Sequence, residues 1–153
     1  MSRVEQRLAA AGITLPSPVA PIANYVPFVR TGNLVHISGQ VSLDAAGGVT
    51  GVVGVEVDME TARRAARLCG INLLAQMRAA CDGDLDRVTR VVKLGGFVQA
   101  GPDFFDIPSV VNGCSDVMVE AFGDAGRHAR SAVGVYRLPR NFAVEVDAVV
   151  EIG

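Results

Sequence analysis

The sequence lacks several features on which many protein functions depend. It has no tryptophan, only two histidines, and a single lysine, Lys93, among its 14 basic residues. The formal charge is −2 and the pI is about 5.6, so no basic excess attracts the phosphate backbone of a nucleic acid. Only 5% of the residues are aromatic, which leaves few side chains on which bases could stack. We therefore expect no nucleic acid partner.

Long hydrophobic runs are also missing. No stretch approaches the roughly 18 apolar residues that a membrane span requires. Residues 1–12 show an amphipathic helical pattern without the apolar core of a signal peptide. Three cysteines, Cys69, Cys81 and Cys114, are odd in number and far apart. These features predict buried free thiols, a cytoplasmic location and no membrane partner.

The usual metal motifs are incomplete. Residues 82–86 (DGDLD) resemble the start of a calcium loop, but Arg87 stands where that loop needs glycine and Lys93 where it needs glutamate. This segment is better explained as a turn that ends a helix. His36 and His128 have no cysteine at metal-ligand spacing. We expect no metal site.

The motifs of nucleotide-binding proteins and of serine hydrolases are also incomplete. Residues 113–117 (GCSDV) lack the closing glycine of a nucleophile elbow. The pair Gly51 and Gly54 has no third glycine and no helix directly after it, as a phosphate cradle would need. The sequence therefore predicts no organic cofactor.

Periodicity and turn signals give an order of elements. Helices are predicted at 2–11, 58–81 and 108–122, and strands at 25–30, 34–37, 49–57, 88–99, 131–136 and 143–152. Two main helices can cover only one face of about six strands, which predicts a two-layer α+β fold with a mixed sheet. We expect one domain over residues 1–153, with residues 1–15 as an N-terminal helical extension.

The hydrophobic content suggests how the other face is covered. Half of all residues are hydrophobic and only 20% are charged. One explanation is that other subunits cover an apolar sheet face. The alternative is a tightly packed monomer.

The segment 126–151 is the most informative for function. It reads as two strands joined at Leu138-Pro139, with Arg130 just before the first strand and Glu145 on the second. A guanidinium that faces a carboxylate across a strand pair could hold a small carboxylic acid together with a water molecule. The alternative is a structural ion pair between Arg130 and Glu145 or Asp147.

Short motifs at consistent spacing extend from about Pro21 to Glu151. They are Tyr25-Val26, Ser38-Gly39-Gln40, Asn112, Arg130-Ser131, Leu138-Pro139 and residues 144–147 (VEVD). Together they resemble the RidA/YjgF family of reactive-intermediate deaminases, and residues 112–116 (NGCSD) and 126–132 (GRHARSA) are similar to its longer branch. The resemblance implies a chorismate-mutase-like fold and a homotrimer, in which three sheets line a central barrel and clefts lie between neighbouring subunits.

The resemblance also implies roles for individual residues. Arg130 would hold the substrate carboxylate, and Glu145 with the backbone of Gly39 would position the attacking water. Tyr25, reaching in from the neighbouring subunit, would close the pocket. Asn112 would support the cleft wall or the geometry of Arg130, and Ser38 and Ala132 would line the substrate site. The implied reaction is hydrolysis of a 2-aminoacrylate-type enamine, or its imine, to a 2-keto acid and ammonia without a cofactor.

Several of these residues also have a purely structural interpretation. Tyr25 could be a core or interface aromatic residue, Asn112 a helix residue bonded to a nearby loop, and His128 an ordinary loop histidine. Many active members of the family carry cysteine two residues after the arginine, where this chain has Ala132. This departure motivates a second hypothesis, a non-catalytic module that binds 2-keto acids. Endoribonuclease activity, a label that some relatives carry, is disfavoured by the acidic pI.

Overall fold

The computed structural model describes residues 1–153 and contains three α-helices and one five-stranded sheet. The helices are α1 (Arg3–Ala10), α2 (Met59–Ala80) and α3 (Ile107–Phe122). The strands are β1 (Phe28–Thr31), β2 (Leu34–Val41), β3 (Val88–Gln99), β4 (Ala129–Val135) and β5 (Val144–Ile152). Short 3₁₀ turns, η1 (Leu85–Arg87), η2 (Gly123–Gly126) and η3 (Pro139–Asn141), lie between them.

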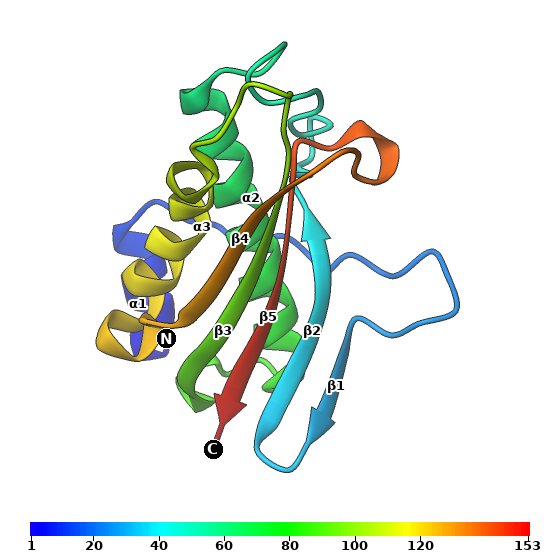
Figure 1. Cartoon of the computed structure of the whole chain (residues 1–153). Helices are drawn as coiled ribbons and strands as arrows, with labels where there is room; N and C mark the ends of the chain where they lie inside the picture. Colours follow the sequence, from blue (N-terminus) through cyan, green and yellow to red (C-terminus); the bar gives the residue numbers. More distant parts are fainter.

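The sheet is mixed, with strand order β1-β2-β5-β3-β4. β4 runs parallel to β3, whereas every other neighbouring pair is antiparallel. The expected pairing of the two closing strands is therefore wrong, because β3 lies between β4 and β5 (Figure 1). Arg130 is also inside β4 rather than just before it.

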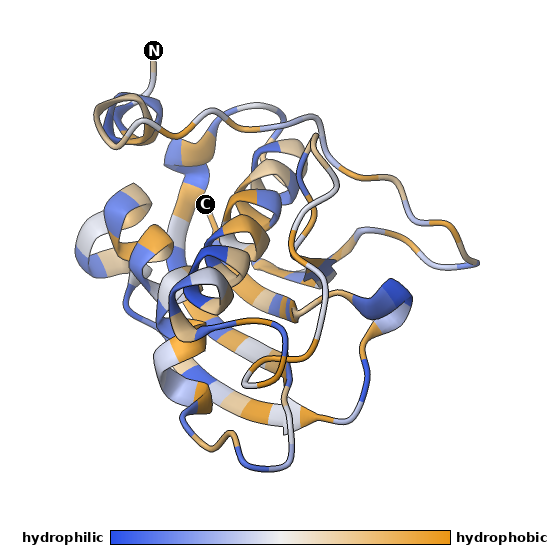
Figure 2. Cartoon of the chain, turned by 90° about the horizontal axis from the view of Figure 1, so that it is seen from above, coloured by the Kyte–Doolittle hydropathy of each residue, from blue (hydrophilic) through white to orange (hydrophobic).

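Helices α2 and α3 pack on one face of the sheet, and the other face carries no helix (Figures 1 and 2). Along β5, alternate residues from Val144 to Ile152 are buried beneath the helices, while Glu145 and Asp147 point to the uncovered face. The predicted two-layer α+β architecture is confirmed.

The sheet has five strands rather than about six. The segment predicted as a strand at 49–57 forms only isolated bridges, such as those from Val53 to Val57 and to Ala100. Gly51 and Gly54 have φ angles of 115° and 88°, which lie outside the extended region and interrupt a strand. The first strand begins at Phe28 rather than Tyr25.

The helix boundaries follow their capping residues. Asp58 caps α2 by accepting a 2.8 Å hydrogen bond from the backbone N–H of Thr61. Ser2 and Glu5 form a capping box at the start of α1, and Pro108 lies in the first turn of α3. These starts agree with the predicted ranges to within two residues.

A glycine pair in β3 allows close approach on both faces. A Cβ on Gly96 would lie 2.7 Å from Cγ1 of Val111 on α3, and one on Gly95 would lie 2.5 Å from Oδ1 of Asp147. The bulges of β3 fall elsewhere, between Val88 and Arg90 and between Val91 and Lys93. The two glycines therefore serve close approach and not a bulge.

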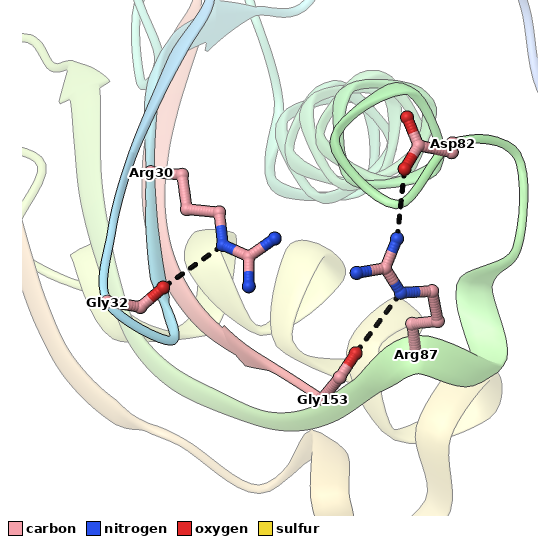
Figure 3. A network of polar contacts seen from close by, with 5 residues as sticks. All are labelled: Arg30, Gly32, Asp82, Arg87 and Gly153. Atoms are coloured by element: carbon pink, nitrogen blue, oxygen red, sulfur yellow. Dashed lines mark hydrogen bonds and ion pairs between the residues drawn. The ribbon is translucent and has the colours of Figure 1, made fainter.

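The segment 82–86 is a turn in which each carboxylate has a partner. Arg87 donates to Oδ2 of Asp82 (3.0 Å) and to the carbonyl of the last residue, Gly153 (3.1 Å; Figure 3). Asp86 accepts from the first backbone N–H groups of α1, and Asp84 accepts from the N–H of Asp86. This arrangement confirms the prediction of a turn after the long helix.

The chain between α1 and β1 crosses the helix side of the molecule and loops out beyond the β1 edge (Figure 1). It is attached to α2 by a 2.9 Å hydrogen bond from Gln76 to the carbonyl of Val19. All three cysteines are buried and free, as predicted. None of the helices has the length and apolar character needed to cross a bilayer.

Candidate functional site

Four of the predicted site residues line one pocket. Ser38, Gly39 and Glu145, together with Tyr25, surround a space of about 150 Å³ beside the end of β2. A bulge in β2 shapes this place, because the pairing with β5 shifts by one residue between Ile37 and Gln40. Two residues of β2, Ser38 and Gly39, therefore oppose one residue of β5.

The absence of a Cβ at Gly39 lets the neighbouring carboxylate lie close to the backbone. A Cβ there would lie 2.8 Å from Oε2 of Glu145, closer than the two atoms can approach. The Glu145 carboxylate thus rests directly against the Gly39 backbone. Burial, and then the nearby Asp147 carboxylate, raise the pKa of Glu145 above its ordinary value. Such a carboxylate holds a proton more readily than an exposed one, which suits general acid–base work.

Arg130 lies elsewhere, on the helix side of β4. Its Nη1 donates to Oδ1 of Asn112 (2.8 Å) and to Oγ of Ser115 (3.1 Å), and its Nη2 donates to the carbonyl of Pro108 (3.5 Å). A guanidinium has five N–H donors, so Nε–H and one Nη2–H remain without a protein partner. Two adjacent donors of this kind can bind a carboxylate in bidentate fashion.

No carboxylate of the chain pairs with Arg130. The ion pairs are Arg67 with Glu120, Arg87 with Asp82, and Arg127 with Asp124. The alternative of a structural pair between Arg130 and Glu145 or Asp147 is therefore wrong for this chain.

Ser115 was not predicted as a neighbour of Arg130, and its contact with His128 was not predicted either. Ser115 Oγ lies 2.9 Å from Nε2 of His128, whose Nδ1 lies 2.6 Å from the carbonyl oxygen of Gly126. The signal was present in the spacing. Ser115 follows Asn112 by three helical positions and therefore shares its face, and His128 precedes Arg130 by two positions, as side chains on one side of an extended segment do.

The Arg130 group and the Glu145 group lie on opposite faces of the sheet. Arg130 is aligned with Leu94, and Leu94 with Ala148. Both of these neighbours are buried beneath the helices, so Arg130 lies on the helix side. Glu145 points to the uncovered face, and a single chain does not bring the two groups together.

Tyr25 lies with the Glu145 group, whereas Ala132 lies with the Arg130 group. Tyr25 lines the pocket of Glu145 within its own chain. The residue is 53% exposed, so it is not a core aromatic residue. Ala132 follows Arg130 on the helix side of β4, where it packs against the hydrophobic core.

The thiols are poorly suited to metal binding or nucleophilic attack. Burial raises the pKa of Cys114 to about 12 and that of Cys69 well above its ordinary value. No cluster of three histidine, cysteine, aspartate or glutamate side chains could hold a metal ion. The candidate groups for binding or catalysis are therefore those around Arg130 and Glu145.

The chain combines two helices over a mixed sheet, an arginine on the edge strand and a glutamate beside a strand bulge. Together these features indicate a known class of α+β proteins. A family model described as "YjgF/chorismate_mutase-like, putative endoribonuclease" matches residues 5–151. The chain belongs to this RidA/YjgF family and has its chorismate-mutase-like fold.

Individual relatives cover nearly the whole chain. Protein TCP17 of Trypanosoma cruzi is 47% identical over 98% of this chain and 94% of its own length. A 2-iminobutanoate/2-iminopropanoate deaminase of Dermatophagoides farinae is 32% identical over 92% of this chain and 94% of its own.

Solved structures agree with this assignment. The Atu1372 protein of Agrobacterium tumefaciens, described as of unknown function, is 48% identical and matches with a TM-score of 0.92 over 98% of this chain and 92% of its own. A protein of Shewanella oneidensis, described as an endoribonuclease candidate, is 31% identical with a TM-score of 0.94 over 97% and 99%. The YjgF product of E. coli, 29% identical, gives 0.62 over 88% and 92%.

Proposed function

We propose that this protein hydrolyses small 2-imino acids, and the enamines from which they form, to 2-oxo acids and ammonia. The observation that carries the proposal is the Arg130 guanidinium, held by Asn112 and Ser115 with two N–H donors left free. The deaminase of Dermatophagoides farinae, 32% identical to this chain, supports the choice of reaction.

The reaction needs few functional groups. Protonation of the methylene carbon of 2-aminoacrylate gives 2-iminopropanoate, and water then adds to the imine carbon. The resulting carbinolamine loses ammonia to leave pyruvate. Arg130 binds the carboxylate, and Glu145, held against the Gly39 backbone, accepts a proton from the attacking water. Tyr25 and Ser38 line the same pocket as Glu145 and close it around the substrate.

Two copies of the chain are needed to complete this site. The Arg130 and Glu145 groups lie on opposite faces of one sheet, so Arg130 of one subunit meets Glu145 of the next. A homotrimer whose uncovered sheet faces line a central barrel provides three such clefts. The buried free thiols favour a reducing location, the cytoplasm.

The direct test is a rate measurement with 2-aminoacrylate generated in situ. The wild-type protein should accelerate the release of ammonia and pyruvate, and Arg130→Ala should lose at least about 100-fold of that acceleration because the carboxylate is no longer held. Arg64→Ala is the matched control, since Arg64 is exposed on α2 and forms no hydrogen bond or ion pair with either group. Equal rates for the wild type, Arg130→Ala and buffer would remove the deaminase proposal.

A second candidate is a non-catalytic module that binds 2-oxo acids in the same cleft. It is favoured by Ala132, which offers only a methyl group packed on the core where many active relatives carry a thiol. In this case 2-oxobutanoate should raise the melting temperature of the wild type but not of Arg130→Ala, while neither protein accelerates ammonia release.

A further inference from the structure

A hydrogen-bonded chain leads away from Arg130 into the α3 side of the molecule. Arg130 Nη1 donates to Ser115 Oγ (3.1 Å), and Ser115 Oγ lies 2.9 Å from His128 Nε2. His128 Nδ1 contacts the carbonyl oxygen of Gly126 at 2.6 Å. A carbonyl oxygen can only accept, so Nδ1 carries its proton in every charge state of the ring. The atom that gains or loses a proton is therefore Nε2.

The direction of the Ser115 hydroxyl depends on that proton. With a neutral ring, Nε2 is an acceptor and the Ser115 hydroxyl donates to it. With a charged ring, Nε2–H donates to Ser115 Oγ, which already accepts from Arg130. The hydroxyl hydrogen must then turn to another acceptor. An anion bound by the free Nε–H and Nη2–H donors of Arg130 would supply such an acceptor next to Ser115.

We propose that His128 and Ser115 couple proton uptake to carboxylate binding at Arg130. The inference rests on the proposed carboxylate-binding role of Arg130 and deepens it. When the ligand binds, Nε2 takes up a proton from solvent, and the Ser115 hydroxyl swings from His128 to the ligand carboxylate. Protonated His128 thus adds both a positive charge and a hydroxyl donor to the site.

The charges around His128 favour this coupling. Burial, opposed in part by the Gly126 hydrogen bond, and then the cations Arg130 and Arg90 lower the pKa of His128 below its ordinary value of 6.5. No carboxylate offsets them: Asp116 on α3 acts on Arg67, and Asp124 of η2 pairs with Arg127. A ligand carboxylate would neutralise the nearest cation and raise the pKa of His128.

The sign of the pH dependence follows. A group with a higher pKa in the complex than in the free protein binds more protons in the complex, so ligand affinity rises as pH falls through the interval between the two values. Above this interval the imidazole is neutral in both states and the affinity levels off. The effect is limited to at most about tenfold per pH unit for one titrating group.

Isothermal titration calorimetry with 2-oxobutanoate tests the coupling. Titrations at about pH 5.5 and about pH 7.5, on either side of the ordinary imidazole pKa, in two buffers with different ionisation enthalpies, give the number of protons taken up. The wild type should take up a fraction of a proton per site and bind several-fold more tightly at the lower pH. His128→Asn should take up fewer protons than the wild type and show a flatter pH profile, because only the raised pKa of Glu145 remains to contribute.

Two further variants complete the design. His36→Asn is the matched control, since His36 is the only other histidine and lies on β2, on the uncovered face. It should keep the proton uptake of the wild type. Ser115→Ala retains the imidazole but removes the hydroxyl, so the proton uptake should shrink and binding at low pH should weaken. Ser115→Ala also answers the question if His128→Asn does not fold.

The possible outcomes separate the coupling at His128 from the carboxylate-binding role of Arg130. Binding of 2-oxobutanoate without proton uptake, or with uptake unchanged in His128→Asn and Ser115→Ala, overturns the coupling and leaves the role of Arg130 intact. If 2-oxobutanoate does not bind to the wild type at either pH, the carboxylate role of Arg130 is overturned and the coupling with it.

Discussion

At the scale of single residues, Glu145 lies in the proposed active site, in an environment that disfavours its charged form. Its carboxylate is half-buried against Gly39 and close to Asp147, and both effects raise its pKa above 4.5, its ordinary value. The unfolded chain has no such environment, so the folded state binds the proton more tightly. Stability from this group is therefore fully present below about pH 4.5 and is lost as pH rises through the folded-state pKa.

We expect Glu145→Gln to stabilise the protein at neutral pH while abolishing deamination. The neutral amide avoids the desolvation of a charge and the repulsion by Asp147, so the melting temperature at pH 7 should rise by roughly a few degrees. The difference should vanish near pH 4, where the wild-type carboxyl is protonated. Thermal unfolding monitored by circular dichroism across this range measures the effect.

A comparison variant makes this result specific to Glu145. Glu120 on α3 forms a two-point ion pair with Arg67, with N–O distances of 3.0 and 3.1 Å, so Glu120→Gln should not stabilise at pH 7. A melting temperature for Glu145→Gln that is lower than that of the wild type at pH 7 would contradict the expectation.

At the scale of elements, the close contact of α2 and α3 positions Arg130. Gly113 of α3 lies against the backbone carbonyl of Arg63 on α2, and a Cβ there would overlap that oxygen. The preceding residue, Asn112, accepts the hydrogen bond from Arg130. The spacing of the two helices therefore sets the position of the group that holds the guanidinium.

Gly113→Ala should separate α2 from α3 and destabilise the fold. Overpacking a contact of this kind costs about 1–3 kcal/mol, partly offset by up to roughly 1 kcal/mol of improved helix propensity. Gly70→Ala is the matched control, because its Cβ would lie 3.2 Å from the Cys114 thiol, a side chain, rather than against backbone. Urea unfolding should rank Gly113→Ala below Gly70→Ala, and the reverse order would refute the role of this contact.

The elements differ in how well local sequence defines them. The ranges of α2 and β3 were predictable, because Asp58 caps the helix and β3 is rich in valine and other strand-forming residues on both sides of its glycine pair. The pairing of β4 was not predictable from the turn at Leu138-Pro139. A short connection suggests a hairpin, yet β4 pairs in parallel with β3, and β5 lies on the other side of β3.

At the scale of the whole molecule, one face of the sheet is not covered by any helix of the same chain. A shallow hollow of about 590 Å³ lies on it, lined by both polar and apolar side chains, among them Lys93, Phe97 and Asp147. The apolar residues Val29 and Val133 are 53% and 45% exposed in the isolated chain. Burial of this face between copies would remove apolar surface from water, as the proposed homotrimer requires.

A complementation experiment tests whether the site is shared between subunits. Arg130→Ala and Glu145→Gln should each be inactive alone. Co-assembled in equal amounts, they should recover about a quarter of the wild-type rate, because three-quarters of random trimers are mixed and each has one intact cleft in three. Sedimentation of the wild type should give three times the 16.0 kDa mass of the chain.

The control for this experiment mixes two variants that alter the same half-site. Arg130→Ala combined with Asn112→Ala should recover less activity than the pair above, because no cleft regains an intact Arg130 environment from one subunit. Failure of Arg130→Ala and Glu145→Gln to complement, despite proven co-assembly, would show that the two residues do not meet across an interface.

The architecture and many of the candidate functional groups could be predicted from the amino-acid sequence alone. Capping residues, glycines and alternating burial act locally, so the helices, most strands and the two-layer fold follow from neighbouring residues. Which residues meet was decided only by the tertiary structure, because strand order and sheet face depend on contacts between distant segments. Glu145 and Arg130 look like partners along the chain but lie on opposite faces, while Asn112, Ser115 and His128 gather around Arg130 only because α3 packs beside β4.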